Sequence, residues 1–240
     1  MLKGEERSRD LPLYHGRRGA PIVARALQET RMFSVIFEVH PKAGQWEAYL
    51  NYARMLRPEL EQIDGFADNI RYRSLRRPGW ILSLSNWRDE KAVVRWRTRM
   101  RHHEVQELGR GAVFSDYHLR VGEITEDTKL PAGYTLQNQR LDETEAGEGA
   151  CVVMANISEP EGWERIAQRT IEWDVFEAVL TPGDLIVLAT LKDAAAGEEF
   201  ERAAMRPEVA RLRRVRVIRD YGMYDRREAP QYYPEVRREE

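Results

Sequence analysis

Two histidines that follow a tryptophan are the residues of this sequence best suited to chemistry. Trp96 precedes His102 and His103 by six and seven residues. Seven residues make about two helical turns, so Trp96 and His103 would share one helix face. A neutral imidazole accepts protons near neutral pH, and an indole supplies a flat apolar wall. These residues predict a substrate pocket that contains a base. The alternative is a core tryptophan beside a solvated helix end.

Further aromatic residues could complete such a pocket. Trp87 ends an apolar run and Asn86 directly precedes it, so we assign both to substrate binding, with core packing as the alternative for the indole. Tyr49 and Tyr52 lie in a helical pattern, and Tyr72 lies in an alternating one. We expect these tyrosines to line a cavity between a helix and a sheet, where their hydroxyls can donate hydrogen bonds to a phenolic substrate. The alternative is a boundary position with a hydrated hydroxyl.

The sequence lacks local motifs for a metal or a nucleotide. It contains no HExxH, no CxxC and no two-His-one-carboxylate spacing. Cys151 is the single cysteine, which excludes an internal disulfide and a cysteine-built zinc site. The GRG at 109–111 lacks the rest of a GxGxxG or P-loop pattern. We therefore expect no metal ion and no nucleotide cofactor, and we expect His40 and His118 to be surface residues.

The charge balance excludes one class of partner. The 240 residues carry a formal net charge of −2, which argues against nucleic-acid binding through bulk charge. We interpret the arginine-rich runs at 95–101 and 211–219 as solvated faces. No apolar run approaches the ~20 residues of a membrane span, and the N-terminus has no apolar signal region. These features predict a cytoplasmic protein with a small-molecule substrate and no nucleic-acid or membrane partner.

The first ordered block should read strand, helix, strand, strand, helix, strand. Its expected strands are 32–39, 66–75, 80–87 and 113–122. The first helix should run from Trp46 to Ile63, and Pro58 should kink or split it. Asp89 should cap the second helix. The apolar stripe of that helix is Val93, Trp96 and Met100.

A second block repeats this plan at a constant offset. Three features recur 104 residues later: Pro78-Gly79 at Pro182-Gly183, Asp89 at Asp193, and Asp116-Tyr117 at Asp220-Tyr221. The opening strand of the second block, 150–157, matches at a larger offset, so the following helix at 162–168 should be shorter by about a dozen residues. We interpret the chain as a tandem repeat of one βαββαβ unit, the ferredoxin-like motif.

The fold class that follows is α+β, with two ferredoxin-like repeats packed sheet to sheet as an α+β barrel. The expected parts are an N-terminal arm 1–30 with a helical turn at 22–28, a first repeat 31–121, a linker 122–149 with a short strand at 134–137, a second repeat 150–225 and a C-terminal tail 226–240. Each opening strand is apolar on both faces, and the linker can span a domain. We therefore expect an intrachain pseudo-dimer, which could form a further homo-oligomer through the arm or tail.

Three segments resemble the antibiotic biosynthesis monooxygenase (ABM) family: IDGF at 63–66, RPGWILSLSNWRDEKAVVRWR at 77–97 and GRGAVFSDYHLRV at 109–121. The resemblance covers about 90 residues of the first block and the second block only in outline. It implies a ferredoxin-like unit that pairs into a dimeric α+β barrel. It also implies one of three functions: cofactor-free oxidation of polyketide-like aromatics, haem degradation, or no catalytic activity.

The haem-degrading branch of this family uses an Asn on the first strand, a Trp on the second helix and a His about ten residues later. Trp96 matches, the histidines are shifted, and the first-strand position is Val35. Our leading hypothesis is therefore an ABM-like monooxygenase that oxidises a small apolar aromatic compound with dioxygen and without a cofactor. His102 or His103 would be the base. Haem binding and degradation is the first alternative, and a non-catalytic binding or structural module is the second.

The constant offset also predicts that the two repeats differ in function. The counterparts of the candidate residues Asn86, Trp87, Trp96, His102 and His103 are Thr190, Leu191, Phe200, Arg206 and Pro207. None of these counterparts can take the matching role, and Pro207 should end its helix early. We therefore expect the ligand site within residues 31–121, with the second repeat completing the barrel.

Overall fold

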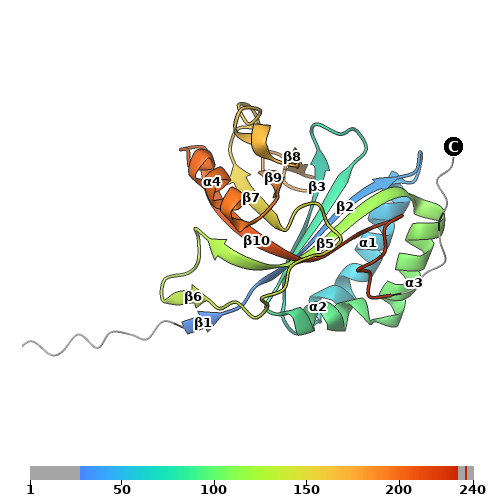
Figure 1. Ribbon diagram of the computed structural model, residues 1–240. Coiled ribbons are helices and arrows are strands. Elements are labelled where there is room, and N and C mark those ends of the chain that lie inside the picture. The colour runs from blue at the N-terminus through green and yellow to red at the C-terminus, as the bar shows by residue number, and fades with distance from the viewer. Residues whose placement is uncertain (1–27, 232–235, 237–240) are drawn as a thin grey trace, which may run out of the picture.

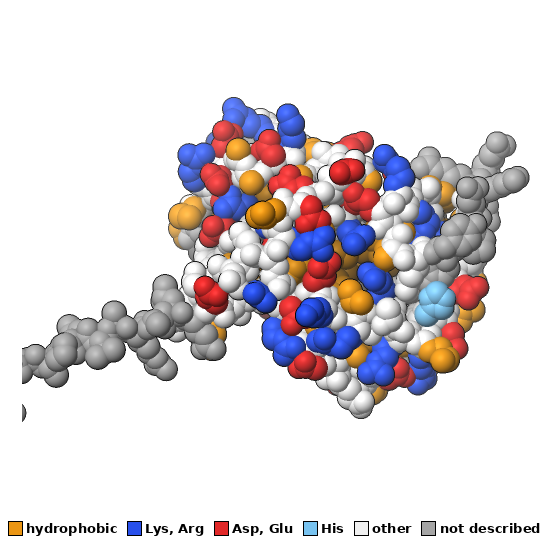
Figure 2. Space-filling view, turned by 60° about the horizontal axis from the view of Figure 1, so that its bottom comes forward, with side chains coloured by type: hydrophobic (Ala, Val, Ile, Leu, Met, Phe, Trp, Pro, Cys, Tyr) orange, Lys and Arg blue, Asp and Glu red, His pale blue; other side chains and the backbone are white. Residues whose placement is uncertain are grey.

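The computed structural model describes residues 28–231 and residue 236. The expected N-terminal arm therefore lies outside the described residues up to residue 27, together with nearly all of its helical turn. No helix in the described part of the chain is long and apolar enough to cross a membrane. On the face shown in Figure 2, basic and acidic side chains are interspersed. This mixture matches the near-zero net charge of the sequence.

Eight antiparallel strands form a closed barrel (Figure 1), in the ring order β10-β5-β2-β4-β3-β8-β9-β7. The strands of the first half are β2 (Phe33–Pro41), β3 (Phe66–Ser74), β4 (Ile81–Trp87) and β5 (Phe114–Asp127). Those of the second half are β7 (Cys151–Ile157), β8 (Glu172–Ala178), β9 (Leu185–Leu191) and β10 (Val209–Gly222). The order β5-β2-β4-β3 in one half matches β10-β7-β9-β8 in the other. The predicted α+β barrel is confirmed.

The helices lie outside the barrel. They are α1 (Trp46–Glu61), α2 (Glu90–Arg97), α3 (Met100–Leu108), the π-helical η1 (Gly109–Val113), the 3₁₀-helical η2 (Ile166–Arg169) and α4 (Ala194–Ala204). Figure 1 shows α1, α2 and α3 gathered on one side of the barrel, whereas α4 lies on the other side. Each half thus has a helix layer over its own outer sheet face.

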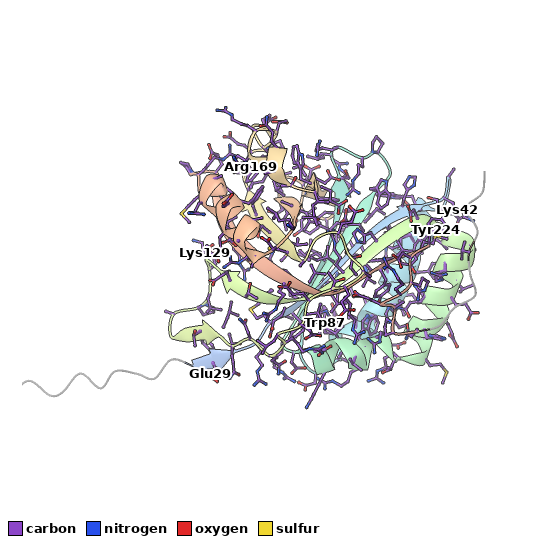
Figure 3. All side chains as sticks on the ribbon, in the orientation of Figure 1. Glu29, Lys42, Trp87, Lys129, Arg169 and Tyr224 are labelled. Atoms are coloured by element: carbon purple, nitrogen blue, oxygen red, sulfur yellow. The ribbon has the colours of Figure 1, made fainter. Side chains whose placement is uncertain are left out.

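The two-residue period of the strands decides which side chains enter the barrel. On β4, Leu82 and Leu84 point inward, whereas Ser85 and Trp87 point toward the helices. Figure 3 shows Trp87 beside α2. The apolar barrel interior consists of Ile36, Tyr72, Leu82, Leu84, Ile124, Val152, Met154, Phe176, Ala178, Ile186, Leu188, Val215 and Val217.

Helix α1 is continuous through Pro58, contrary to the predicted kink or split. Its buried face is formed by Tyr49, Ala53, Leu56 and Leu60, spaced at helical intervals. Pro58 lies on the exposed side, where water can satisfy the carbonyl that loses its intrahelical donor. Packing of the apolar face therefore outweighs the missing hydrogen bond.

The predicted second helix is two helices. Asp89 caps α2 as expected, accepting a hydrogen bond from the Ala92 amide at 2.8 Å. The Thr98 hydroxyl donates to the Val94 carbonyl at 3.0 Å, and Arg99 adopts an extended conformation before α3 begins. Met100 is 78% exposed, so its assignment to the apolar stripe was wrong.

The second half follows the predicted offset in detail. Asp193 caps α4 through the Ala196 amide at 2.9 Å, as Asp89 caps α2. Helix α4 ends at Ala204, ahead of Pro207, as expected. The predicted short helix at 162–168 is reduced to the 3₁₀ turn η2, and the buried Trp163 stacks on Phe200 with ring centroids 6.3 Å apart.

The linker and β10 differ from the prediction. Strand β5 continues to Asp127, so the linker begins later than residue 122. The expected short strand is β6 (Tyr134–Leu136), and it pairs in parallel with β1 (Gln28–Thr30). Arg213 and Arg214 on β10 are buried rather than solvated, because β10 has a neighbour on both edges and packed residues on both faces.

We expect Phe200→Leu to lower the free energy of unfolding by roughly 1 kcal/mol, as a core substitution that nearly conserves volume. Phe200 is buried against Trp163, on the side of the barrel opposite α1–α3, so ligand binding near α2 should persist. Urea unfolding measures the first effect. Loss of ligand binding by a folded Phe200→Leu protein would contradict the second expectation.

Candidate active site

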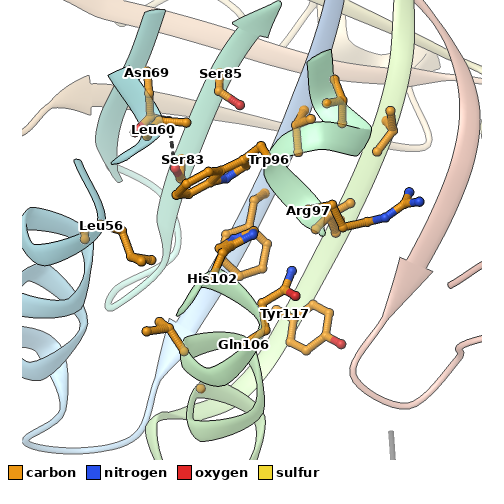
Figure 4. Close-up of a pocket in the computed structure, with 18 of the residues that line it drawn as sticks. Leu56, Leu60, Asn69, Ser83, Ser85, Trp96, Arg97, His102, Gln106 and Tyr117 are labelled. Atoms are coloured by element: carbon orange, nitrogen blue, oxygen red, sulfur yellow. Dashed lines mark hydrogen bonds between the residues drawn. The ribbon is translucent and has the colours of Figure 1, made fainter. Parts of the chain in front are cut away.

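A cavity of about 210 Å³ lies between helices α1–α3 and the outer sheet face of the first half. Figure 4 shows the α1 side chains Leu56 and Leu60 at one side of this cavity. Small-molecule sites usually measure ~300–1,000 Å³, so this cavity suits a small ligand. Its apolar walls consist of Val35, Phe37, Leu56, Leu60, Trp87, Val93, Val105, Leu119 and Val121.

The break between α2 and α3 places His102 against Trp96 at the cavity. The two ring centroids lie 4.3 Å apart with an interplanar angle of 21°, and Figure 4 shows the rings facing each other. Nδ1 of His102 is buried and has no hydrogen-bond partner among the described residues. The imidazole of His102 thus forms part of the cavity wall.

Burial lowers the pKa of His102 to about 4. A hydrogen bond with the Trp96 backbone acts in the opposite direction, and the neighbouring His103 lowers the pKa further. His102 is therefore a neutral imidazole at physiological pH, able to accept a hydrogen bond or a proton at a buried atom.

This lowered pKa predicts acid sensitivity. Between pH 6.5 and about 4 the unfolded chain protonates His102 whereas the folded protein does not, so stability falls as the pH falls through this interval. The loss from this residue is at most roughly 3 kcal/mol. We expect His102→Phe to lose less stability than the unaltered protein when urea unfolding is compared at pH 7 and pH 4.5. Equal losses would contradict the prediction.

The structure brings most of the candidate residues together. Trp87, Trp96, Tyr49, Tyr52 and His102 all line the cavity. The tyrosines come from the first helix, and Trp87 points outward from β4.

Two of the candidate residues lie elsewhere. His103 is exposed on α3, because the helix break rotates it off the face of Trp96. Asn86 points to the barrel side of β4, where it accepts a hydrogen bond from the Ser34 hydroxyl at 2.7 Å and donates one to Asp68 at 2.7 Å. Assigning either residue to the pocket was wrong.

Three further interpretations need correction. Tyr72 is buried inside the barrel rather than in the helix–sheet cavity, because inward positions alternate along β3. His40 stacks on Trp80 with centroids 5.4 Å apart, and His118 is half-buried with Nε2 2.6 Å from Asp220. These two histidines are therefore packed residues rather than surface ones.

Residues of the second half also line the cavity, contrary to the expectation that the site lies within residues 31–121. Arg219 and Tyr221 of β10 reach it, as do Arg226 and Gln231 of the tail. The repeated Asp-Tyr pair was a signal in the sequence, since Tyr117 and Tyr221 both line the cavity. The tail has no sequence pattern that places it there.

The C-terminal tail closes part of the cavity instead of extending away. Arg226 donates a hydrogen bond to the Tyr117 hydroxyl, and the Gln231 amide donates to the Arg97 carbonyl at 3.3 Å. Glu228 anchors the tail by accepting from the Thr144 hydroxyl at 2.8 Å. The expected extension is thus part of the candidate site.

Arg110 reaches the same tyrosine from the GRG segment, donating to the Tyr117 hydroxyl at 2.7 Å. The segment forms η1, and a Cβ on Gly109 would lie 2.5 Å from the Phe114 ring. The glycine therefore allows a close approach between η1 and β5, which is a structural role and not a phosphate-binding one.

A separate ionic cluster lies at one end of the barrel interior. Arg120 is completely buried and pairs with Glu38 and with Glu172, the latter at 3.1 Å. Arg77 pairs with Glu38 and with Asp174 at 2.6 Å. Burial acts to raise the pKa of Glu38, but Arg120 and Arg77 together hold it below its ordinary value.

Potential metal ligands gather in this cluster. One ligand atom from each of Glu38, His118 and Glu172 lies within 4.8 Å of the others. Arg120 already neutralises both carboxylates, so a cation would have to displace its guanidinium group. The cluster is best described as a buried ion-pair network.

Comparison with known proteins identifies relatives. Residues 32–108 match the family described as "Antibiotic biosynthesis monooxygenase". A Pyricularia oryzae protein named "Jasmonate monooxygenase ABM" is 44% identical over 227 residues, which cover 85% of this chain and 99% of that protein.

Two solved structures are more distantly similar. An aldoxime dehydratase in complex with butyraldoxime has 12% identity and a TM-score of 0.49, over 79% of this chain and 80% of that one. Protein SO0527 from Shewanella oneidensis has 13% identity and a TM-score of 0.37, over 39% of this chain and 91% of that one.

Proposed function

Because this chain belongs to the antibiotic biosynthesis monooxygenase family, and is thus an oxidoreductase of the monooxygenase class, we propose that it oxygenates a small, largely apolar compound in the helix–sheet cavity. The observation that carries this proposal is the His102–Trp96 stack, which lies in the wall of an apolar cavity and contains a buried ring nitrogen without a hydrogen-bond partner among the described residues. We place the reaction in the cytoplasm, as the composition predicts.

A jasmonate is the first substrate to test, because the relative that matches 85% of this chain is named a jasmonate monooxygenase. The cavity of about 210 Å³ accommodates a compact molecule and has mostly apolar walls. A small phenolic aromatic, predicted from the sequence, is the second substrate class, and the hydroxyls of Tyr49 and Tyr52 support it.

The proposed reaction needs no cofactor. His102 removes a proton from a CH₂ group made acidic by a neighbouring carbonyl, which a phenol presents in its keto tautomer. The resulting carbanion donates electrons to dioxygen, the CH₂ carbon becomes C=O, and the second oxygen atom leaves as water with the two hydrogens. The apolar walls keep bulk water from the reacting carbon. Because His102 is neutral in the folded protein, it is ready to accept the proton, and a negatively charged substrate offsets part of the cost of charging it.

The haem alternative fits these residues less well. His102 would be the residue to hold the haem iron, but the cavity of about 210 Å³ is small for a tetrapyrrole, and Trp96 covers one face of the imidazole. Titration with haemin tests it directly, since a Soret band that shifts and saturates at one equivalent would support haem binding.

Product analysis tests the proposed function. We expect the purified protein, incubated with jasmonic acid or a phenolic aromatic under ¹⁸O₂, to give a product that contains one labelled oxygen atom. The reaction should proceed in protein treated with a metal chelator and without added haem. Failure to oxygenate either class of compound, by protein whose fold is intact, would overturn the proposal.

A further inference from the structure

The cavity combines apolar walls with an excess of positive charge. Arginine side chains line it at positions 71, 97, 110, 219 and 226. Glu90 is the acidic residue among the described lining residues, and Arg140 already binds it at 2.7 Å. An apolar cavity lined by several guanidinium groups is suited to an amphipathic anion.

The five arginines differ in their partners. Arg110 and Arg226 both donate hydrogen bonds to the Tyr117 hydroxyl. Arg97 and Arg219 have no carboxylate within ion-pair distance in the described part of the chain, and Nε of Arg97 is buried without a hydrogen-bond partner. These two guanidinium groups can therefore bind a ligand without first breaking an ion pair.

Arg97 of α2 and Arg219 of β10 both line the cavity, and both act electrostatically on the Tyr221 hydroxyl of β10. Tyr221 of β10 is almost fully buried there, and burial raises the pKa of its hydroxyl to about 12. Arg97, Arg226 and Arg219 all act on this hydroxyl electrostatically in the opposite direction. Asp142 lies near enough to be affected by Arg219, but its carboxylate is hydrogen-bonded to Arg140. Several cationic groups thus surround one neutral phenol.

We propose that Arg97, Arg219 and the Tyr221 hydroxyl form an anion subsite that binds the carboxylate of an apolar acid. Repulsion between like charges in a partly buried site is relieved when an anion binds between them, and guanidinium groups match a carboxylate in geometry. In Figure 4, Arg97 points away from the His102–Trp96 stack, so the acid would extend from the subsite past that stack toward Leu56. Assigning the acid as the substrate rests on the proposed function, whereas its binding does not.

Arg71, on the opposite side of the cavity, is the alternative position at which the carboxylate could bind. It lies on β3, with its guanidinium carbon 6.0 Å from the centre of the Tyr49 ring, and its Nε also lacks a partner. A single guanidinium group beside an aromatic ring can be stabilised by that ring. Arg226 lies over the Tyr221 ring, with its guanidinium carbon 5.5 Å from the ring centre. Arg97 and Arg219 have no such ring among the described residues, which favours these two arginines as the site for the carboxylate.

Binding of matched acid and ester pairs tests the subsite independently of turnover. The probes are jasmonic acid and 1-naphthylacetic acid, each compared with its methyl ester by isothermal titration calorimetry. We expect each acid to bind roughly tenfold or more tightly than its ester at pH 7.5, because charge-assisted hydrogen bonds are lost in the ester. Added salt should weaken binding of the acids more than binding of the esters.

Three variants locate the subsite, and one serves as a control. Arg219→Gln and Arg97→Gln should each weaken binding of the acids by roughly tenfold and leave binding of the esters nearly unchanged. Arg71→Gln tests the alternative position. Arg99→Gln is the matched control, since Arg99 is exposed between α2 and α3 and does not line the cavity. Thermal unfolding of each variant checks the fold.

The outcomes separate the subsite from the proposed function. The inference is overturned if neither acid binds, if the acids bind no more tightly than their esters, or if only Arg71→Gln removes the preference. It holds if the preference depends on Arg97 and Arg219, even where no oxygenated product forms. If the preference depends on these arginines but no oxygenated product forms, the proposed function is overturned and the anion subsite is retained. Because both arginines are tested separately, misfolding of one variant does not decide the result.

Discussion

Replacing His102 by alanine should lower kcat/KM by roughly 10²–10⁴-fold, the usual contribution of a positioned general base. His102 lines the cavity, its buried Nδ1 has no hydrogen-bond partner among the described residues, and its imidazole is neutral because its pKa is lowered to about 4. Oxygen uptake with the substrate identified by ¹⁸O labelling measures the effect. Binding of the acid probe by the variant should persist, because the carboxylate contacts are made elsewhere in the cavity.

His103 provides the matched control for this experiment. It is the adjacent histidine, but it is exposed on α3 and does not line the cavity. His103→Ala should therefore retain nearly full activity. Trp96→Phe should give an intermediate loss, because a smaller ring still supports the imidazole face. Loss of activity in His103→Ala with retention in His102→Ala would reverse the assignment of the base.

Replacing Arg120 by methionine should have the largest effect on stability, lowering the free energy of unfolding by roughly 3–5 kcal/mol. Arg120 is completely buried and pairs with Glu38, which is itself buried. The substitution removes one of the two guanidinium groups that compensate the Glu38 carboxylate, and leaves Glu172 without its 3.1 Å partner. Urea unfolding at pH 7 measures the loss.

A double variant distinguishes an uncompensated charge from a simple packing defect. Adding Glu38→Gln to Arg120→Met removes the buried negative charge, so we expect part of the lost stability to return. If the double variant is as unstable as the sum of the two single variants, the ion pair is not the cause. A loss below about 1 kcal/mol for Arg120→Met alone would show that Arg77 compensates Glu38 sufficiently.

Several features of the fold follow from local sequence patterns. Asp89 and Asp193, which lie 104 residues apart, each cap a helix. At both positions the aspartate precedes an apolar helical stripe and accepts a hydrogen bond from a free amide of the first helical turn. The aromatic candidates Trp87 and Trp96 reach the cavity because their strand and helix periods are encoded locally. The motifs at 63–121 that resemble the family mark turns and strands, which short stretches of sequence encode. The match of residues 32–108 to the family confirms this resemblance.

Other features could not be predicted from the spacing of residue types alone. Nothing in the local pattern shows that Thr98 turns its hydroxyl back to Val94 and ends α2, which is the reason that His102 rather than His103 meets Trp96. In the sequence, the adjacent residues Asn86 and Trp87 are equally plausible as cavity residues. The register of β4 in the barrel sends Asn86 inward and Trp87 toward the helices.

The sequence by itself determined the order of the barrel strands along the chain, the aspartate caps of α2 and α4 and the family, because each depends on residues within a few positions of one another. Only the tertiary structure decided what completes the cavity. Closing the barrel places β10 beside β5, and this pairing brings Arg219 and Tyr221 next to helix α2 from the other half of the chain. Such a pairing is set by the burial of whole sheet faces, a property that no short segment of the sequence carries.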